Sequence, residues 1–309
     1  MPKKAKPTNS LSAQDFCEMN YHKPVLLNET LRNINVVQEG KYIDCTLGDG
    51  GHTLEILRNG GKVLGIDYNE SSLLRASKRI ANEGFSRNFL GILGNFRDIN
   101  ILAVKNGFNN TNGILYDLGY SSTQLEESMG VSFIKDQPLD MRLDKTLGVT
   151  AADLVNSLTE RELARLFIEY GDEKYSKRFA KAIVDARNLK KFQTTKQLAN
   201  LIASEAPPGY DHNRIHPATR VFQALRIAVN DEIENLKISL PLAAQLLLPG
   251  GRILVITFHS LEDKVVKDFG RDVRSLIKSV YKKPIIPSNE EVEENNRARS
   301  AKMRVFEKI

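Results

Sequence analysis

The sequence predicts an α/β fold, a doubly wound parallel sheet with a mostly helical domain inserted into it. First, an apolar run at 42–47 closes on three glycines between positions 48 and 51 and is followed by helical spacing. Second, apolar runs at 62–67 and 113–117 each end in an acid. Third, the alternation of strands and helices stops near position 124. Strand, glycine turn and helix in this order open a nucleotide-type site.

Length and composition indicate a globular chain with more than one unit. Its 309 residues exceed one typical domain of ~100 to 200 residues, which favours a large domain with an insertion. The hydrophobic fraction is 41%, and no apolar run approaches the ~20 residues of a membrane span. The two cysteines, Cys17 and Cys45, argue against a disulfide framework. We therefore expect a cytoplasmic protein without membrane association.

The charge balance favours a polyanionic partner. The formal net charge is +6 and the pI is near 9.1, and lysine and arginine supply most of the sequence-independent affinity for nucleic acid. The first residues, with Lys3, Lys4 and Lys6, lack the apolar core of a signal peptide. We interpret residues 1–20 as a basic, disordered tail.

The sheet domain is expected in two pieces, residues 21–123 and 214–309. In the first piece, a helix carries Leu27 and Leu31 on one face, and a helix at 71–83 should turn Leu74 inward. The other elements expected there are strands at 42–47, 62–67, 89–93 and 113–117.

The inserted domain is expected at 124–213, where the pattern is helical and rich in charge up to Pro207-Pro208-Gly209. In the second piece of the sheet domain, the pattern predicts one long helix from His216-Pro217 to about 248. A strand at 252–258, a helix at about 263–280 and a strand at 303–308 should follow.

The glycine turn is compatible with NAD, with FAD or with S-adenosylmethionine. An acid after the second strand, Asp67, suits a ribose hydroxyl pair in all three cases. Gly48-Asp-Gly-Gly lacks the spacing of the dinucleotide fingerprint, and Asp49 inside the turn would repel a diphosphate. These observations favour S-adenosylmethionine, with a purely structural glycine turn as the alternative.

Asp117, at the end of the fourth strand, is the candidate catalytic residue. Methylation of an exocyclic base nitrogen needs an acceptor that orients the amino group for in-line attack. Asp117-Leu-Gly-Tyr120 has that layout, and Tyr120 could stack on a flipped base. A helix cap for Asp117 and a packed aromatic for Tyr120 are the structural alternatives.

Two charged groups have less specific patterns. A lone histidine beside acids, His259 with Glu262 and Asp263, more often forms a capped turn than a metal site, and we predict no metal. Basic side chains could contact phosphate or lie on a solvated face with equal weight. These candidates are Arg214, His216, Arg220, Arg226 and the basic residues at 297–304.

Several motifs closely resemble the RsmH (MraW) family of bacterial methyltransferases. They are His22-Lys-Pro-Val-Leu-Leu27, Asp44-Cys-Thr-Leu-Gly-Asp-Gly-Gly-His52, Asp117-Leu-Gly-Tyr-Ser-Ser122, Pro138-Leu-Asp-Met-Arg142, His216-Pro-Ala-Thr-Arg-Val-Phe-Gln-Ala-Leu-Arg226, Phe258-His-Ser-Leu-Glu-Asp263 and Arg297-Ala-Arg-Ser-Ala-Lys302. The resemblance implies a Rossmann-like class I sheet and S-adenosylmethionine-dependent methylation of a cytosine N4 in the decoding region of small-subunit (16S) rRNA. Tyr68-Asn69, Tyr120 and Met129 depart from the family pattern.

The resemblance also implies the site residues. Gly50, Gly51 and His52 would form the cofactor loop, Asp67 would bind the ribose, and Phe96, Asp117 and Gln124 would complete the pocket. The partner would be the small-subunit rRNA or the assembled subunit, with the inserted domain recognising the substrate, and a homodimer stays open. Two alternatives are a nicotinamide oxidoreductase and a non-catalytic RNA-binding ribosome assembly factor.

Overall fold

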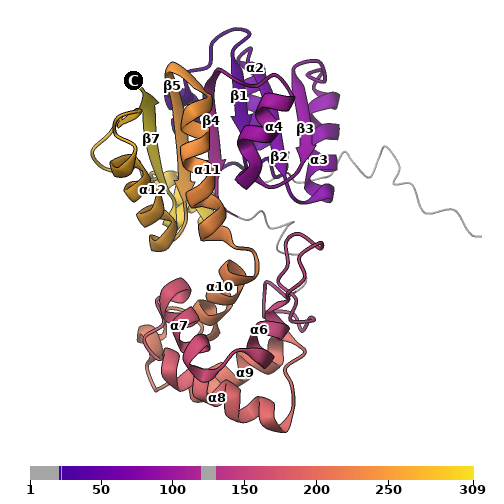
Figure 1. Ribbon diagram of the computed structural model, residues 1–309, viewed down its shortest axis with the longest axis vertical. Coiled ribbons are helices and arrows are strands. Elements are labelled where there is room, and N and C mark those ends of the chain that lie inside the picture. Colours follow the sequence, from indigo (N-terminus) through magenta and orange to yellow (C-terminus); the bar gives the residue numbers. More distant parts are fainter. Residues whose placement is uncertain (1–20, 22, 120–129) are drawn as a thin grey trace, which may run out of the picture.

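The computed structural model describes Tyr21, residues 23–119 and residues 130–309, which form two units (Figure 1). We call residues 23–119 and 231–309 the sheet unit and residues 130–230 the helical unit. The expected tail at 1–20 lies outside the described residues. None of the described helices combines the length and the hydropathy needed to cross a membrane.

The sheet unit is built on seven strands in the order β3-β2-β1-β4-β5-β7-β6. The first five strands run parallel, while β7 is antiparallel to both β5 and β6. Their bounds are β1 Lys41–Asp44, β2 Lys62–Asp67, β3 Phe89–Leu93, β4 Thr111–Asp117, β5 Leu247–Thr257, β6 Ile277–Ser279 and β7 Lys302–Lys308. The parallel register brings the carboxyl ends of β1, β2 and β4 to one edge, with Asp44 opposite Gly65 on one side and Leu115 on the other.

Helices cover both faces of this sheet, so the doubly wound prediction is confirmed. One buried cluster contains side chains of α4, α11 and α12, and the opposite cluster contains side chains of α1, α2 and α3. The bounds are α1 Leu27–Ile34, α2 Gly51–Arg58, α3 Glu70–Asn82, η1 Phe96–Asp98, α4 Ile99–Lys105, α11 Glu232–Leu246, α12 Ser260–Asp272, α13 Asn289–Glu294 and η3 Asn296–Ser300. Each face has its own core.

The helical unit has a separate core below the sheet edge (Figure 1). Its elements are α6 Ala151–Ser157, α7 Glu160–Gly171, α8 Ser176–Leu189, α9 Thr195–Glu205, η2 Tyr210–Asn213 and α10 Ala218–Val229. Buried side chains of this core run from Leu139 to Val229 and include α10. Helix α10 crosses α7 so closely that a Cβ at Gly171 would lie 2.6 Å from the carbonyl oxygen of Arg220. The packing of this unit therefore continues beyond position 213.

Three expectations for local structure are wrong. The single helix from 216 to 248 is two helices, because Asp231 adopts a left-handed φ of 49° between α10 and α11. Their apolar stripes face different cores, which a continuous pattern in sequence does not reveal. Helix α12 ends at Asp272, and Ile277–Ser279 pairs with β7 instead. Leu74 points outward and is 55% exposed, since Ala76 and Ile80 form the buried stripe of α3.

Candidate active site

A cavity of about 710 Å³ lies between the carboxyl edge of the sheet and the helical unit. The sheet unit contributes the glycine turn, the acids at the ends of β2 and β4, and Arg297 from η3. The helical unit contributes a wall of both apolar and polar side chains. Its side chains include Val131, Phe133, Leu143, Leu147, Phe222 and Gln223. The cavity therefore needs both units.

The glycine turn is shaped by close packing. Gly50 has a φ of 73° and directly precedes α2, and a Cβ there would lie 3.1 Å from the Cβ of Ala76. A Cβ at Gly51 would lie 2.4 Å from Cγ of Pro24. Gly48 and Gly51 line the cavity, whereas Gly50 does not. Both glycines of the expected cofactor loop thus have structural reasons for lacking a side chain.

Asp67 lies at the cavity and is held by the backbone on both sides. Its Oδ2 accepts the N–H of Gly48 at 2.8 Å, and its Oδ1 accepts the N–H of Asn69 at 2.8 Å. Burial is the main cause that raises the pKa of Asp67 to about 7, against the opposing effect of these two N–H groups. Each carboxylate oxygen can accept a further hydrogen bond, so the group fits a ribose hydroxyl pair.

Asp49 has a partner inside the protein. The Nε of Arg75 donates to its Oδ1 at 2.9 Å, and both side chains are largely buried. The positive charge of Arg75 offsets the carboxylate. Asp49 would therefore repel a diphosphate much less than an unpaired carboxylate would, and the choice among cofactors depends on other observations.

Asp117, the last residue of β4, carries a buried acceptor. Its N–H donates to Oγ1 of Thr46 at 2.6 Å, which fixes the end of the strand. Among the described residues, its Oδ1 has no hydrogen-bond partner although it is buried beside the cavity. Burial, followed by the nearby charge of Asp44, raises the pKa of Asp117 to about 7. A buried acceptor without a partner fits a donor on a bound molecule.

The two other predicted pocket residues differ in outcome. Phe96, at the start of η1, lines the cavity and packs edge-to-face against Tyr116 with ring centroids 5.6 Å apart. Gln124 lies outside the described residues, as do Tyr120 and Met129. Tyr68, one of the departures from the family pattern, lines the cavity beside Asp67.

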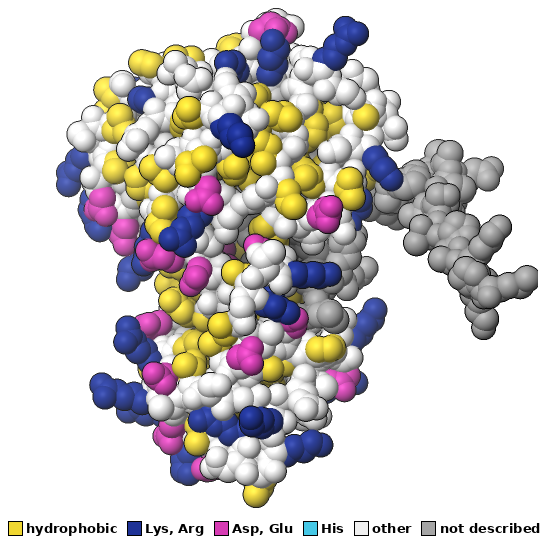
Figure 2. Space-filling view, turned by 45° about the vertical axis from the view of Figure 1, so that its right-hand side comes forward, with side chains coloured by type: hydrophobic (Ala, Val, Ile, Leu, Met, Phe, Trp, Pro, Cys, Tyr) yellow, Lys and Arg dark blue, Asp and Glu magenta, His cyan; other side chains and the backbone are white. Residues whose placement is uncertain are grey.

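Three of the predicted phosphate contacts are engaged in ion pairs. Arg226 makes two contacts with Glu232, at 2.9 and 3.2 Å, and Arg304 makes two contacts with Asp263, at 2.7 and 3.0 Å. Arg220 contacts an acid as well, at 3.2 Å. On the face shown in Figure 2, Lys and Arg side chains are scattered over both units among Asp and Glu. Charge alone therefore does not define an RNA surface there.

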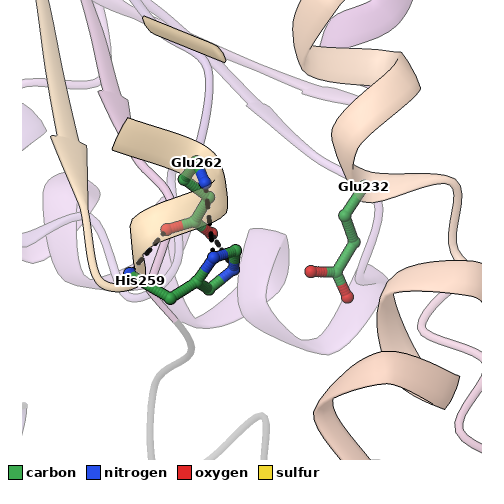
Figure 3. A group of neighbouring side chains, drawn as sticks. All are labelled: Glu232, His259 and Glu262. Atoms are coloured by element: carbon green, nitrogen blue, oxygen red, sulfur yellow. Dashed lines mark hydrogen bonds and ion pairs between the residues drawn. The ribbon is translucent and has the colours of Figure 1, made fainter. Parts of the chain in front are cut away.

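His259 forms the predicted capped turn at the start of α12 (Figure 3). Its Nδ1 accepts the N–H of Glu262 at 3.3 Å, and Oε2 of Glu262 accepts the N–H of Phe258 at 2.8 Å. Glu232 approaches from the opposite helix, and the three side chains could surround a cation by geometry. Because Nδ1 accepts from the backbone, a neutral ring carries its hydrogen on Nε2, which lies 3.0 Å from Oε1 of Glu262. Metal binding through Nε2 would move this hydrogen to Nδ1. The ring could then no longer accept the N–H of Glu262, and the cap would be lost.

The sequence pattern does not predict the helical wall of the cavity. Phe133 stacks on His216 with centroids 4.7 Å apart and meets Phe222 at 4.9 Å. Phe222 stands at helical spacing in α10, where an aromatic usually packs in a core, and Phe133 lies outside the helices, so the local pattern marks neither as a cavity residue. Arg297, in contrast, could have been identified as a cavity residue from the sequence, because it is the first residue of the basic motif at 297–302.

The sheet order, the antiparallel β7 and the acids that end β2 and β4 at one cavity define a Rossmann-like class I methyltransferase. The model of the MraW methylase family matches residues 19–309, and the chain belongs to that family. It is thus an S-adenosylmethionine-dependent methyltransferase.

Two curated relatives are similar over nearly the whole chain. The ribosomal RNA small subunit methyltransferase H of Carboxydothermus hydrogenoformans is 45% identical, over 93% of this chain and 98% of its own length. The protein of the same name from Persephonella marina is 41% identical, over 93% of this chain and 99% of its own length.

Proposed function

We propose that this protein methylates the N4 amino group of one cytidine in the decoding region of small-subunit (16S) rRNA. The single observation that carries the proposal is Oδ1 of Asp117, a buried acceptor without a partner among the described residues at the cavity. An exocyclic amine is a donor that such an oxygen can orient. The names of both relatives support rRNA as the substrate.

The site residues divide between cofactor and substrate. We propose that the loop with Gly50, Gly51 and His52 surrounds the methionine part of S-adenosylmethionine and that Asp67 accepts the ribose hydroxyls. Phe96 would pack against the adenosine part, and Asp117 and Gln124 would complete the cofactor pocket. S-adenosylmethionine supplies an electrophilic methyl group on a sulfonium sulfur.

Asp117 has the chemistry of both an orienting acceptor and a base. A carboxyl group with a pKa of about 7 exists in ionised and protonated forms near neutral pH. The ionised form accepts an N–H of the amine and aligns the nitrogen with the methyl group, and it then takes the proton that the nitrogen loses. This pKa suits a base that works near pH 7.

We further propose that the helical unit recognises the rRNA, because its aromatic side chains Phe133 and Phe222 line the same cavity as Asp117. We also propose that the protein forms a homodimer and is located in the cytoplasm. Light scattering of the purified protein and fractionation of cells test these two points.

The deciding experiment measures methyl transfer to unmethylated small-subunit rRNA and to assembled subunits, with the modified nucleoside identified by mass spectrometry. Asp117→Ala should lower kcat by about 10²- to 10⁴-fold while S-adenosylmethionine still binds. Asp117→Asn, which keeps the shape but not the base, is the matched control and should also be impaired. Unchanged turnover in both variants would refute the catalytic role. An absence of cofactor binding by calorimetry would favour the assembly-factor alternative.

A further inference from the structure

The buried contact between His52 of α2 and Asp117 of β4 has no explanation in cofactor binding alone. His52 is 5% exposed, and its Nδ1 lies 3.6 Å from Oδ2 of Asp117. Its Nε2 lies 3.0 Å from the carbonyl oxygen of Val25. The ring is therefore held between a backbone acceptor and the candidate catalytic carboxyl.

The contact with Val25 sets the tautomer of the ring. A carbonyl oxygen can only accept, so Nε2 of His52 must carry the hydrogen. Burial lowers the pKa of His52 to about 4, so the ring is neutral near pH 7. Its Nδ1 then has a lone pair and no hydrogen. An acceptor thus faces Oδ2 of Asp117.

Asp117 can be the matching donor. Burial raises its pKa to about 7. The carboxylates of Asp44 and Glu262 act in the same direction, while Arg297 and the N–H of Gly119 act against them. Its protonated form has an O–H that a bare Nδ1 can accept. The present 3.6 Å is longer than a hydrogen bond, but catalytic contacts commonly tighten when substrate binds.

We propose that His52 is a positioning residue for methyl transfer. Its Nδ1 accepts the O–H of protonated Asp117, so that the other carboxyl oxygen, which has no hydrogen, faces the cavity. This inference rests on the proposed function. In the step, the N4 lone pair bonds to the methyl carbon, the carbon–sulfur bond breaks with its electron pair on sulfur, and the N4 proton passes to Oδ1 of Asp117. A half-turn of the carboxyl group then points the O–H at Nδ1 of His52. The proton leaves to water when the products leave, and His52 never becomes charged.

Two variants separate the contacts of the ring. His52→Gln places an amide near the position of Nε2 and can still donate to Val25, but it lacks the acceptor toward Asp117. His52→Asn places an amide oxygen near Nδ1 and retains that acceptor. Both variants should bind S-adenosylmethionine with similar affinity, and His52→Gln should lower kcat about tenfold more than His52→Asn.

The pH profile of kcat adds a readout that a purely structural role would not move. Loss of the acceptor destabilises protonated Asp117, so the acid limb of the profile should move to lower pH in His52→Gln and stay in place in His52→Asn. Equal turnover and coincident profiles in the two variants would overturn the proposal. A common loss of cofactor affinity, with equal turnover of the two variants at saturating S-adenosylmethionine, would also overturn it, because His52 would then act on the cofactor alone.

Nitrogen-15 spectra of histidine-labelled protein test the tautomer without any rRNA. The signal of His52 should show hydrogen on Nε2 and should not titrate between about pH 5.5 and 8.5. Hydrogen on Nδ1, or titration near the ordinary histidine pKa, contradicts the inference. If the tautomer is as expected but the parent protein transfers no methyl group to rRNA, the proposed function fails and with it the role of His52 in that reaction.

Discussion

The two walls of the cavity differ in how they are specified. On the sheet wall, the acids of β2 and β4 follow directly from where each strand ends, and the glycine turn follows from close packing against Pro24 and Ala76. On the helical wall, Phe222 of α10 and Phe133, which contacts it, reach the cavity through the packing of the helical core. A site assembled from strand ends is visible in sequence, whereas a wall that depends on helix packing is not.

The largest expected effect comes from removing the support of the helical wall. Phe167 is fully buried between α7 and its neighbours. Phe167→Ala should destabilise the helical unit by about 3 to 5 kcal/mol, because it leaves a cavity in that core. Thermal unfolding measures the loss, and Ile168→Ala, at a side chain 52% exposed, is the neighbouring control.

If methyl transfer by Phe167→Ala falls while its affinity for the cofactor stays within about twofold, the two walls have separate roles. An equal loss of methyl transfer and of cofactor affinity would mean that the two walls do not act separately.

The next largest effect is the opposite pH dependence that Asp67 should give to the free energy of unfolding and to cofactor affinity. An acid whose pKa is raised on folding, here from 3.8 to about 7, binds more protons in the folded than in the unfolded chain between these values. The free energy of unfolding of the parent should therefore fall as pH rises through this range, by about 1 to 4 kcal/mol from this group. Cofactor affinity should rise over the same range, because ionised Asp67 is the better acceptor for ribose hydroxyls.

Asp67→Asn is the matched variant for this prediction. Denaturant unfolding at pH 5 and pH 8 should show a smaller loss of stability in the variant than in the parent, and calorimetry should show weaker cofactor binding that changes little with pH. A variant with the same pH dependence as the parent would mean that another buried acid, such as Asp44, controls it.

The predictable part of the molecule is the part governed by local rules. Alternation and strand ends predicted the sheet and singled out Asp67 and Asp117, which line the cavity; Phe96, which also lines it, was implied only by the family resemblance. The break at Asp231 was not predictable, because two apolar stripes in phase look like one helix until they face different cores. The pairing of Asp49 with Arg75 was equally invisible, since 26 positions separate them in the chain.

A smaller effect tests whether the glycine turn needs its close packing. Gly51→Ala should cost about 1 to 3 kcal/mol of stability, because the new Cβ would lie 2.4 Å from Cγ of Pro24. The shift of Pro24 should also weaken cofactor binding. Gly148→Ala is the control, since nothing lies within 4 Å of its Cβ position. Equal stability of the two variants, measured by thermal unfolding, would show that Pro24 gives way without cost.

The smallest effect concerns the contact that joins the two walls. Arg226 of the helical unit and Glu232 of the sheet unit form a two-contact ion pair across the break at Asp231, with side chains 17% and 15% exposed. A double-mutant cycle with Arg226→Gln and Glu232→Gln should give a coupling energy of about 1 kcal/mol, against about 0.3 kcal/mol for the exposed pair Arg165–Glu169. An ion pair of this kind fixes the relative orientation of the two units more than it stabilises the fold.

Loss of the pair should therefore raise KM for rRNA while the affinity for S-adenosylmethionine, held by the sheet wall, stays the same. A change in cofactor affinity of equal size would mean that the two walls act as one.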